Sequence, residues 1–336
     1  MSQDIKEQQL QRISHMFHAY TSSRTLMTAV QLGIFNCISQ GNSTVEQVAS
    51  AIDATPRGVR MLLNALVGLE FLKKKDQYYE LEPISARFLV KTSADYVGAM
   101  FEIDDLWNTW SHLNQVIKTG QPPRALEQEQ KATEFFPHLV KSLHTMSLGR
   151  SARLADMLLK DKANIPLNVL DIACGSGVWS IPLAEKSDKV MVTAQDFSKV
   201  LELTKTYVQR HGVEKQYAYL AGDLKQVDYG ENKYDIVILG NIVHSEGENS
   251  SRVLFQKLGK ALKPHGRIII IDMFPNNERS APAYPLLFAL NMLVNTSEGD
   301  TFTFEEYCQW LNEANIPKVF MEEIAPEFSV IVGEVL

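Results

Sequence analysis

The residues best suited to chemistry in this sequence are aspartates and glycines at the ends of predicted strands. Asp171 precedes a glycine-rich turn at residues 174–177, whose sequence is Cys-Gly-Ser-Gly. Asp196 follows the first glycine of that turn by 21 residues, the spacing typical of an acid that holds ribose hydroxyls. Asp223 follows a third strand. Since glycines let the backbone approach a ligand above the strand ends, the set predicts a nucleoside-binding edge.

The type of nucleoside follows from the charges around the turn. A dinucleotide fingerprint requires a third glycine where this sequence has Ser180, which disfavours an NAD-dependent oxidoreductase. The carboxylate of Asp171 would repel a pyrophosphate, whereas it would attract the cationic amino-acid end of S-adenosylmethionine. We therefore expect S-adenosylmethionine as the cofactor.

The elements that must position these residues lie after Pro166, where predicted strands and helices alternate. Such alternation is typical of an α/β fold with a doubly wound, mostly parallel sheet, and four consecutive isoleucines from Ile268 predict a strand buried on both faces. The predicted strands are residues 167–173, 189–194, 217–221, 234–240, 267–273, 319–324 and 328–335, and the predicted helices are residues 178–185, 198–211, 250–262 and 304–314.

The N-terminal part of the sequence is mostly helical and predicts a separate domain. Ser43 and Glu46 have the spacing of a capping box, and Thr55 with Pro56 marks the start of a helix with one apolar face. Two short strands separated by the charged turn at residues 73–76 complete the outline of a winged helix. We expect a winged-helix domain at residues 1–95, connecting helices at 96–160 and a nucleoside-binding domain at 161–336.

Composition narrows the function classes. The chain has 336 residues, 45% of them hydrophobic, with a formal net charge of −7, so binding to nucleic acid or an anionic membrane is not expected. The three cysteines, Cys37, Cys174 and Cys308, are widely separated, which predicts free thiols and no metal site. The first residues lack the apolar segment of a signal peptide, so we expect a cytoplasmic protein.

Residues 169–177, Asp196, residues 222–224 and the segment 234–244 resemble the S-adenosylmethionine-dependent O-methyltransferases of the caffeate/hydroxyindole type. Residues 29–35 and 56–66 resemble the dimerising winged helix of that family. The resemblance extends from about residue 12 to residue 336. It implies a Rossmann-like class I methyltransferase sheet of about seven strands, a homodimer, and a small, aromatic or polyketide-like metabolite as methyl acceptor.

Matching positions imply roles for individual residues. His244 corresponds to the family's general base, and Asp272 to an acid that orients it. The implied cofactor contacts are Asp171, Ala173, Gly175, Gly177, Asp196, Phe197, Gly222, Asp223, Leu224 and Asn241. We expect the acceptor pocket to be lined by Trp107, His144 and Met146 from the connecting helices and by Tyr284, Phe288 and Met292 from the last domain.

The sequence departs from the plant enzymes at several of these positions. They have glycines in place of Ala173 and Cys174, and Asp-Trp in place of Ser245-Glu246; the family's second glutamate falls near Thr301. Methylation of carbon or nitrogen therefore stays open as an alternative. A winged-helix transcription regulator is disfavoured because residues 55–69 carry only two basic side chains, Arg57 and Arg60.

Overall fold

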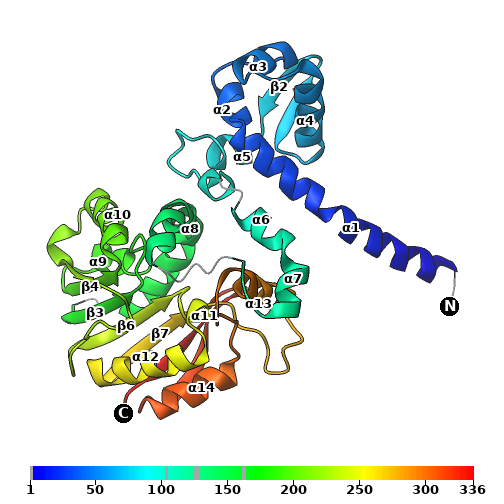
Figure 1. Cartoon of the computed structure of the whole chain (residues 1–336). Helices are drawn as coiled ribbons and strands as arrows, with labels where there is room; N and C mark the ends of the chain where they lie inside the picture. The colour runs from blue at the N-terminus through cyan, green and yellow to red at the C-terminus, as the bar shows by residue number, and fades with distance from the viewer. Residues whose placement is uncertain (1–2, 103–104, 124–128, 161–163) are drawn as a thin grey trace. The chain divides into compact units, whose positions relative to one another are not determined.

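The computed structural model describes residues 3–102, 105–123, 129–160 and 164–336, and the chain divides into two units, residues 1–104 and residues 105–336 (Figure 1). The elements of the first unit are α1 (Gln3–Gln31), α2 (Ile34–Ser39), α3 (Val45–Ala51), α4 (Pro56–Gly68), β1 (Leu72–Lys75), β2 (Tyr78–Leu81), α5 (Pro83–Phe88) and the 3-10 helix η1 (Gly98–Phe101).

Local capping signals determine where the helices of the first unit begin. Thr55 caps α4 through a bond from the Gly58 backbone N–H, as predicted. The predicted capping box is displaced by one residue, because Thr44 rather than Ser43 is the N-cap of α3. The side chain of Gln47 accepts hydrogen bonds from the backbone N–H of both Ser43 and Thr44, at 2.9 and 3.1 Å, and thereby completes the box that Glu46 was expected to form.

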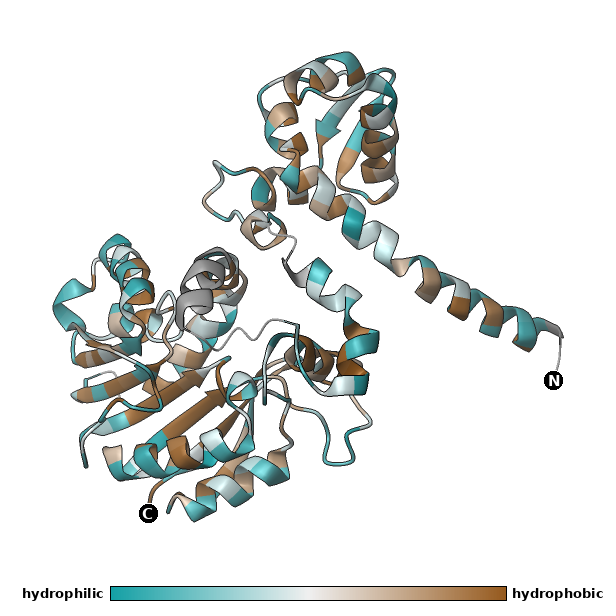
Figure 2. Cartoon of the chain, viewed as in Figure 1, coloured by the Kyte–Doolittle hydropathy of each residue, from teal (hydrophilic) through white to brown (hydrophobic). Residues whose placement is uncertain are grey.

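The core of the first unit lies between α4 and the two-stranded sheet. Val59, Leu63 and Leu66 form one buried face of α4, and Leu72 from β1 and Tyr79 from β2 belong to the same cluster. Helix α1 contrasts with this core, since its N-terminal part exposes apolar side chains, which alternate with hydrophilic ones along the helix in Figure 2. The exposed apolar side chains of α1 are Ile5, Leu10, Ile13, Met16, Phe17 and Tyr20.

The second unit is built on a seven-stranded sheet with the order β5-β4-β3-β6-β7-β9-β8. The first five of these strands pair in parallel, and β9 runs antiparallel to both β7 and β8. This confirms the predicted mostly parallel sheet. The strands are β3 (Leu167–Ile172), β4 (Val190–Asp196), β5 (Tyr217–Ala221), β6 (Tyr234–Gly240), β7 (Leu262–Ile271), β8 (Lys318–Ala325) and β9 (Phe328–Glu334).

Helices cover both faces of this sheet (Figure 1). The helices of this unit are α6 (Asp105–Ser111), α7 (Leu113–Thr119), α8 (Glu129–Leu159), α9 (Ile181–Lys186), α10 (Ser198–Arg210), α11 (Val243–Glu246), α12 (Glu248–Ala261), α13 (Ala283–Asn295) and α14 (Phe304–Glu313), with the 3-10 helix η2 (Glu214–Gln216) before β5. Helix α9 begins three residues later than predicted, because residues 178–180 form a turn in front of Pro182.

The central strands are apolar on both faces and therefore support two cores, as Figure 2 shows by their mostly brown colour. Ile269 and Ile271 pack in the cluster with α8, α9 and α10, whereas Ile268 and Ile270 pack in the cluster with α12 and α14. Alternate residues of one strand thus support opposite layers. Within the described part of the chain, every helix is too short or too polar to cross a membrane.

Candidate active site

The carboxyl ends of five parallel strands meet at one edge of the sheet. Strand β3 lies between β4 on one side and β6 on the other, so the chain order reverses there. Ligands of open α/β sheets bind in the crevice at such a point. The glycine-rich turn follows β3, Asp196 ends β4, and His244 lies beyond the end of β6.

The turn after β3 is held in an unusual backbone conformation. Ala173, Gly175 and Gly177 have φ angles of 49°, 55° and 75°. Residues other than glycine, such as Ala173, seldom have a positive φ, and strained residues of this kind are concentrated at functional sites. The turn is closed by a bond from the Gly177 N–H to the Cys174 carbonyl, at 2.7 Å, and the Thr204 hydroxyl on α10 donates to the Gly175 carbonyl at 2.6 Å.

Asp196 connects this turn to the end of β4. Its Oδ2 accepts a hydrogen bond from the Gly175 N–H at 2.9 Å, and its Oδ1 accepts one from the Phe197 N–H at 2.7 Å. Burial raises the pKa of Asp196 to about 6, although these two backbone bonds act in the opposite direction. Each carboxylate oxygen has a second acceptor position, so the side chain can still accept from a ligand hydroxyl.

Asp171 is fully buried below the turn. Its Oδ2 accepts a 2.5 Å hydrogen bond from the Ser180 hydroxyl, which lies 2.9 Å from the hydroxyl of Tyr217, and its Oδ1 has no partner in the described structure. Burial raises the pKa of Asp171 to about 7; the Ser180 bond lowers it and the charge of Asp196 raises it further. Ser180, which replaces the third glycine of a dinucleotide turn, is thus the hydrogen-bond donor to this acid.

The end of β5 is joined to the turn by a residue that the sequence analysis did not identify. The buried side chain of Gln195 donates to the Gly222 carbonyl at 2.7 Å and accepts from the Ala173 N–H at 3.3 Å. A polar residue inside an apolar strand, next to Asp196, is the signal in the sequence. Asp223 is half-buried and its Oδ1 accepts from the Lys225 N–H, while Leu224 is buried.

His244 and Asp272 form a hydrogen-bonded pair. His244 Nδ1 lies 2.7 Å from Asp272 Oδ1, and the His244 backbone N–H donates to Asp272 Oδ2 at 3.1 Å. Asn241, with a φ of 57° at the end of β6, turns the chain into α11, which carries His244. The His244 side chain is 11% exposed, and because Nδ1 faces the carboxylate, Nε2 is the ring nitrogen with no hydrogen bond to the described protein. The pair has the arrangement of a general base with its orienting acid.

The predicted acceptor-wall residues fall into two groups. The ring of Phe288 meets the imidazole of His244 edge to face, with centroids 5.0 Å apart, and Tyr284 lies next to Phe288 at 6.1 Å. Met292 is buried on the same helix, α13, while Tyr284 is 64% exposed. Helix α6 contacts α13 through the Trp110 Nε1 bond to Asn291, and Trp107 is half-buried on α6.

The structure places His144 against the glycine-rich turn. His144 Nδ1 lies 2.9 Å from the Ser176 hydroxyl, and the imidazole packs on Tyr207 with centroids 4.1 Å apart. Burial lowers the pKa of His144 to about 4, with His211 and Arg210 acting in the same direction, so this histidine is neutral at neutral pH. Met146, two residues later, is exposed. Of the predicted pocket residues, Phe288 is thus described in contact with the His244 ring, and Tyr284 in contact with Phe288.

The described residues contain no cluster of three or more histidine, cysteine or acidic side chains that could hold a metal ion. The three cysteines are free thiols.

Two family models match the chain. Residues 14–91 match an O-methyltransferase dimerisation domain, and residues 132–316 match an O-methyltransferase domain. A curated relative, 3-hydroxy-5-methyl-1-naphthoate 3-O-methyltransferase of Streptomyces sahachiroi, is 23% identical over 88% of this chain and 86% of its own length.

Two solved structures have the same fold along nearly the whole chain. One, from Nostoc punctiforme PCC 73102, is assigned as an O-methyltransferase; it is 30% identical, covers 96% of this chain and 98% of its own, and has a TM-score of 0.84. The other is human N-acetylserotonin methyltransferase in complex with S-adenosylmethionine, which is 22% identical, covers 98% of each chain and has a TM-score of 0.83.

Proposed function

The chain belongs to the O-methyltransferase family, and we propose that it transfers the methyl group of S-adenosylmethionine to a hydroxyl of a small-molecule metabolite, with His244 as the general base. The observation that carries this proposal is the His244–Asp272 pair at the sheet edge that also holds the glycine-rich turn. S-adenosylmethionine supplies an electrophilic methyl group on a sulfonium centre when it is bound.

The donor set at the sheet edge suits S-adenosylmethionine better than a phosphate-bearing cofactor. The described side chains that hydrogen-bond to residues 173–177 come from Gln195, Asp196, His144, Thr204 and Ser180, and none of these is a lysine or an arginine. A cationic ligand beside the buried carboxyl groups of Asp171 and Asp196 would stabilise their ionised forms.

We assign parts of the cofactor to particular residues. The turn from Asp171 through Ala173, Gly175 and Gly177 would lie against the methionine part, and Asp196 would accept hydrogen bonds from the ribose. The residues proposed to border the rest of the cofactor are Phe197, Gly222, Asp223, Leu224 and Asn241. The unpartnered Oδ1 of Asp171 supports the first assignment, because a buried acceptor without a partner is costly unless a ligand or water satisfies it.

His244 would remove the proton of the acceptor hydroxyl. A hydroxyl oxygen must lose its proton as it attacks, and the free nitrogen of a neutral imidazole can accept that proton. Asp272 would hold the imidazole in the tautomer whose Nε2 is free to act as the base, which follows from the 2.7 Å contact at Nδ1. General-base catalysis of this kind contributes about 10²–10⁴-fold to the rate.

The acceptor would be a flat aromatic hydroxyl compound. Phe288 and Tyr284 offer aromatic faces beside His244, and Met292 lies on the same helix. An aromatic and sulfur-containing wall suits a planar apolar ligand. The relatives named above act on a hydroxynaphthoate and on N-acetylserotonin according to their names, and both names describe aromatic compounds. Trp107, His144 and Met146 would contribute to this pocket from the helices of residues 96–160.

The protein would act as a homodimer assembled through residues 1–95. The apolar side chains exposed along α1 support this proposal, as does the match of residues 14–91 to a dimerisation domain. Exposed apolar surface of this extent is typical of an interface.

The decisive experiment is a screen of hydroxylated aromatic compounds with S-adenosylmethionine labelled in its methyl group, followed by identification of the labelled atom. Label on a hydroxyl oxygen is the expected result. Label on carbon or nitrogen, or on an aromatic amine but no phenol, would contradict the proposed reaction.

A further inference from the structure

Arg279 lies in the loop between β7 and α13, outside the residues to which the proposed reaction gives a role. The loop turns tightly around Asn276, whose N–H donates to the Ala281 carbonyl at 2.7 Å and whose Oδ1 accepts from the N–H of Ser280 and Ala281. Arg279 has a φ of 49° in this turn, a conformation that is uncommon for a residue with a side chain. The loop is thus ordered by its own hydrogen bonds and presents Arg279 to neighbouring segments.

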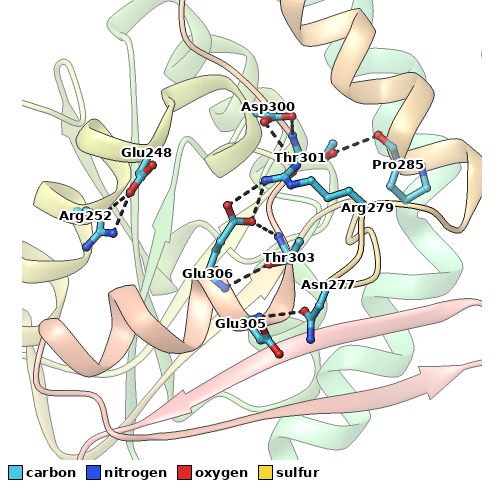
Figure 3. Close-up of polar contacts among 10 residues, drawn as sticks. All are labelled: Glu248, Arg252, Asn277, Arg279, Pro285, Asp300, Thr301, Thr303, Glu305 and Glu306. Carbon is cyan, nitrogen blue, oxygen red and sulfur yellow. Dashed lines mark hydrogen bonds and ion pairs between the residues drawn. The ribbon is translucent and has the colours of Figure 1, made fainter.

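The guanidinium of Arg279 contacts the backbone carbonyl of Thr301 and the carboxylates of Asp300 and Glu306 (Figure 3). Its Nη1 donates to the Thr301 carbonyl at 2.7 Å and lies 3.5 Å from Asp300 Oδ2. Its Nη2 lies 2.9 Å from each carboxylate oxygen of Glu306. Arginine is suited to such a site, because its planar fork satisfies several acceptors at once.

Glu306 holds the other side of this contact in place. It is the third residue of α14 and forms a capping box with Thr303, whose N–H donates to Glu306 Oε2 at 2.7 Å. Partial burial raises the pKa of Glu306, but the hydrogen bonds from Thr303 and Arg279 outweigh it and lower the pKa overall. Glu306 is therefore ionised at neutral pH and available to Arg279.

The segment that Arg279 holds lies directly on His244. We call residues 296–301 the strap. The Asp300 N–H in the strap donates to the His244 carbonyl at 2.9 Å. A Cβ added at Gly299 would lie 2.6 Å from the same carbonyl oxygen and 2.4 Å from Thr296 Oγ1. The strap therefore packs so closely on the His244 backbone that a residue with a side chain would not fit at position 299.

The strap also contacts the helix that faces the imidazole. The Thr301 hydroxyl donates to the Pro285 carbonyl in the first turn of α13 at 3.2 Å (Figure 3). Phe288, one turn later, contacts the ring of His244. One segment therefore supports both the backbone of the proposed base and the aromatic wall beside it.

We infer that Arg279 is a positioning residue for the methyl transfer: it holds the strap against His244 and α13 and so keeps the imidazole aligned with Asp272 and Phe288. The inference rests on the proposed role of His244. Asp272 positions the histidine from one side, through its ring and its N–H, and the strap positions it from the other side, through its carbonyl.

Arg252, on α12, provides a matched control because it also pairs with a glutamate of α14. Its guanidinium pairs with Glu248 at 2.8 Å and with Glu313 at the other end of α14, as Figure 3 shows in part. Arg252 and Arg279 are similarly accessible, with side chains 26% and 37% exposed. Arg252 differs from Arg279 in having no described bond to the strap, so replacing it removes a comparable ion pair without loosening His244.

The test compares Arg279→Met with Arg252→Met in four measurements. These are turnover of an acceptor identified in the labelling screen, the affinity for S-adenosylhomocysteine by calorimetry, the Tm, and the downfield NMR signal of the His244 ring proton bonded to Asp272. The signal is assigned by its absence in His244→Ala. We expect Arg279→Met to lower kcat by about tenfold or more and to weaken the signal, with the S-adenosylhomocysteine affinity unchanged within about twofold. Arg252→Met should keep both kcat and the signal.

Two conservative variants test the inference if Arg279→Met does not fold. Glu306→Gln preserves the capping box while weakening the ion pair, and Arg279→Lys keeps the charge but loses the bidentate fork. Both should show smaller losses of the same kind. Equal kcat and equal NMR signals in Arg279→Met and Arg252→Met would overturn the inference. Failure of the proposed function would look different, because His244→Ala would then retain full activity.

Discussion

Replacing Asp171 by asparagine should change how the stability of the ligand-free protein depends on pH. Burial raises the pKa of Asp171 from 3.8 to about 7 in the folded protein, whereas the unfolded chain keeps the ordinary value. Between these values the folded protein holds a proton that the unfolded chain has released. Raising the pH therefore favours unfolding, and the stability that the protonated carboxyl provides is lost as the pH rises toward 7 and beyond.

The expected size follows from the two pKa values. Each pKa unit corresponds to about 1.36 kcal/mol, so the wild-type protein should lose about 2.5 kcal/mol between about pH 5 and about pH 8 through this group alone. Asp171→Asn has no proton to release there and should lose none of this amount. Any constant cost of the buried amide cancels, because the prediction concerns only the change with pH.

Thermal unfolding at the two pH values measures the difference. Relative to Asp171→Asn, the wild-type Tm should fall by about 3–5 °C more on going from the lower to the higher pH. Asp188→Asn is the control, since the Asp188 side chain is 87% exposed and its replacement should leave the pH dependence of the wild type intact. If the Tm fell by the same amount between the two pH values in the wild type and in Asp171→Asn, the conclusion that burial holds Asp171 protonated would be refuted.

Three further predictions concern the cofactor, the assembly and the packing. Asp196→Ala should weaken S-adenosylmethionine binding by about 1.5–3 kcal/mol, and unchanged affinity in calorimetry would exclude its contact with the ribose. Light scattering should find a dimer, and charge substitutions at the exposed Ile13 and Phe17 should produce a monomer; a monomeric wild type would contradict the proposed interface. Gly240→Ala should cost about 1–3 kcal/mol, because its Cβ would lie 2.2 Å from Trp179, and an unchanged Tm would contradict this.

Much of the fold could be predicted from the sequence because strand burial patterns and helix caps depend on residues that are close together in the chain. The apolar run around Ile268–Ile271 predicts a strand buried on both faces, and this strand lies inside the sheet between β6 and β9. Thr55 and Pro56 predict the start of α4 because capping depends on neighbours in the chain. The one-residue error at Ser43 has a local cause as well: two residues can serve as the cap, and the side chain of Gln47 decides between them.

The candidate site could be predicted from the sequence only in part. The sequence places Asp196 and His244 at strand ends, and the pairing of His244 with Asp272 follows from the neighbouring positions of β6 and β7. It does not show that Asp171 is buried against Ser180 and Tyr217, since that depends on how three elements pack. Arg279 was missed for the same reason: its partners lie 22 and 27 residues away in the chain, and no motif connects them.

His144 illustrates the difference between a residue type and its surroundings. The sequence suggests His144 for the acceptor pocket but does not show which other residues it contacts. In the structure it contacts Ser176 of the glycine-rich turn and packs on Tyr207, contacts that require α8 and α10 to lie next to each other. Helix periodicity identifies the face on which a side chain lies but not the element against which that face packs.

The most direct test of the proposed reaction is the rate of methyl transfer by His244→Ala, measured with labelled S-adenosylmethionine and an acceptor hydroxyl. The account predicts a decrease in kcat of about 10²–10⁴-fold with the affinity for S-adenosylmethionine nearly unchanged, and a smaller decrease for Asp272→Asn. A His244→Ala variant that keeps more than about a tenth of the wild-type rate would contradict the account, since this loss is well below the range of general-base catalysis.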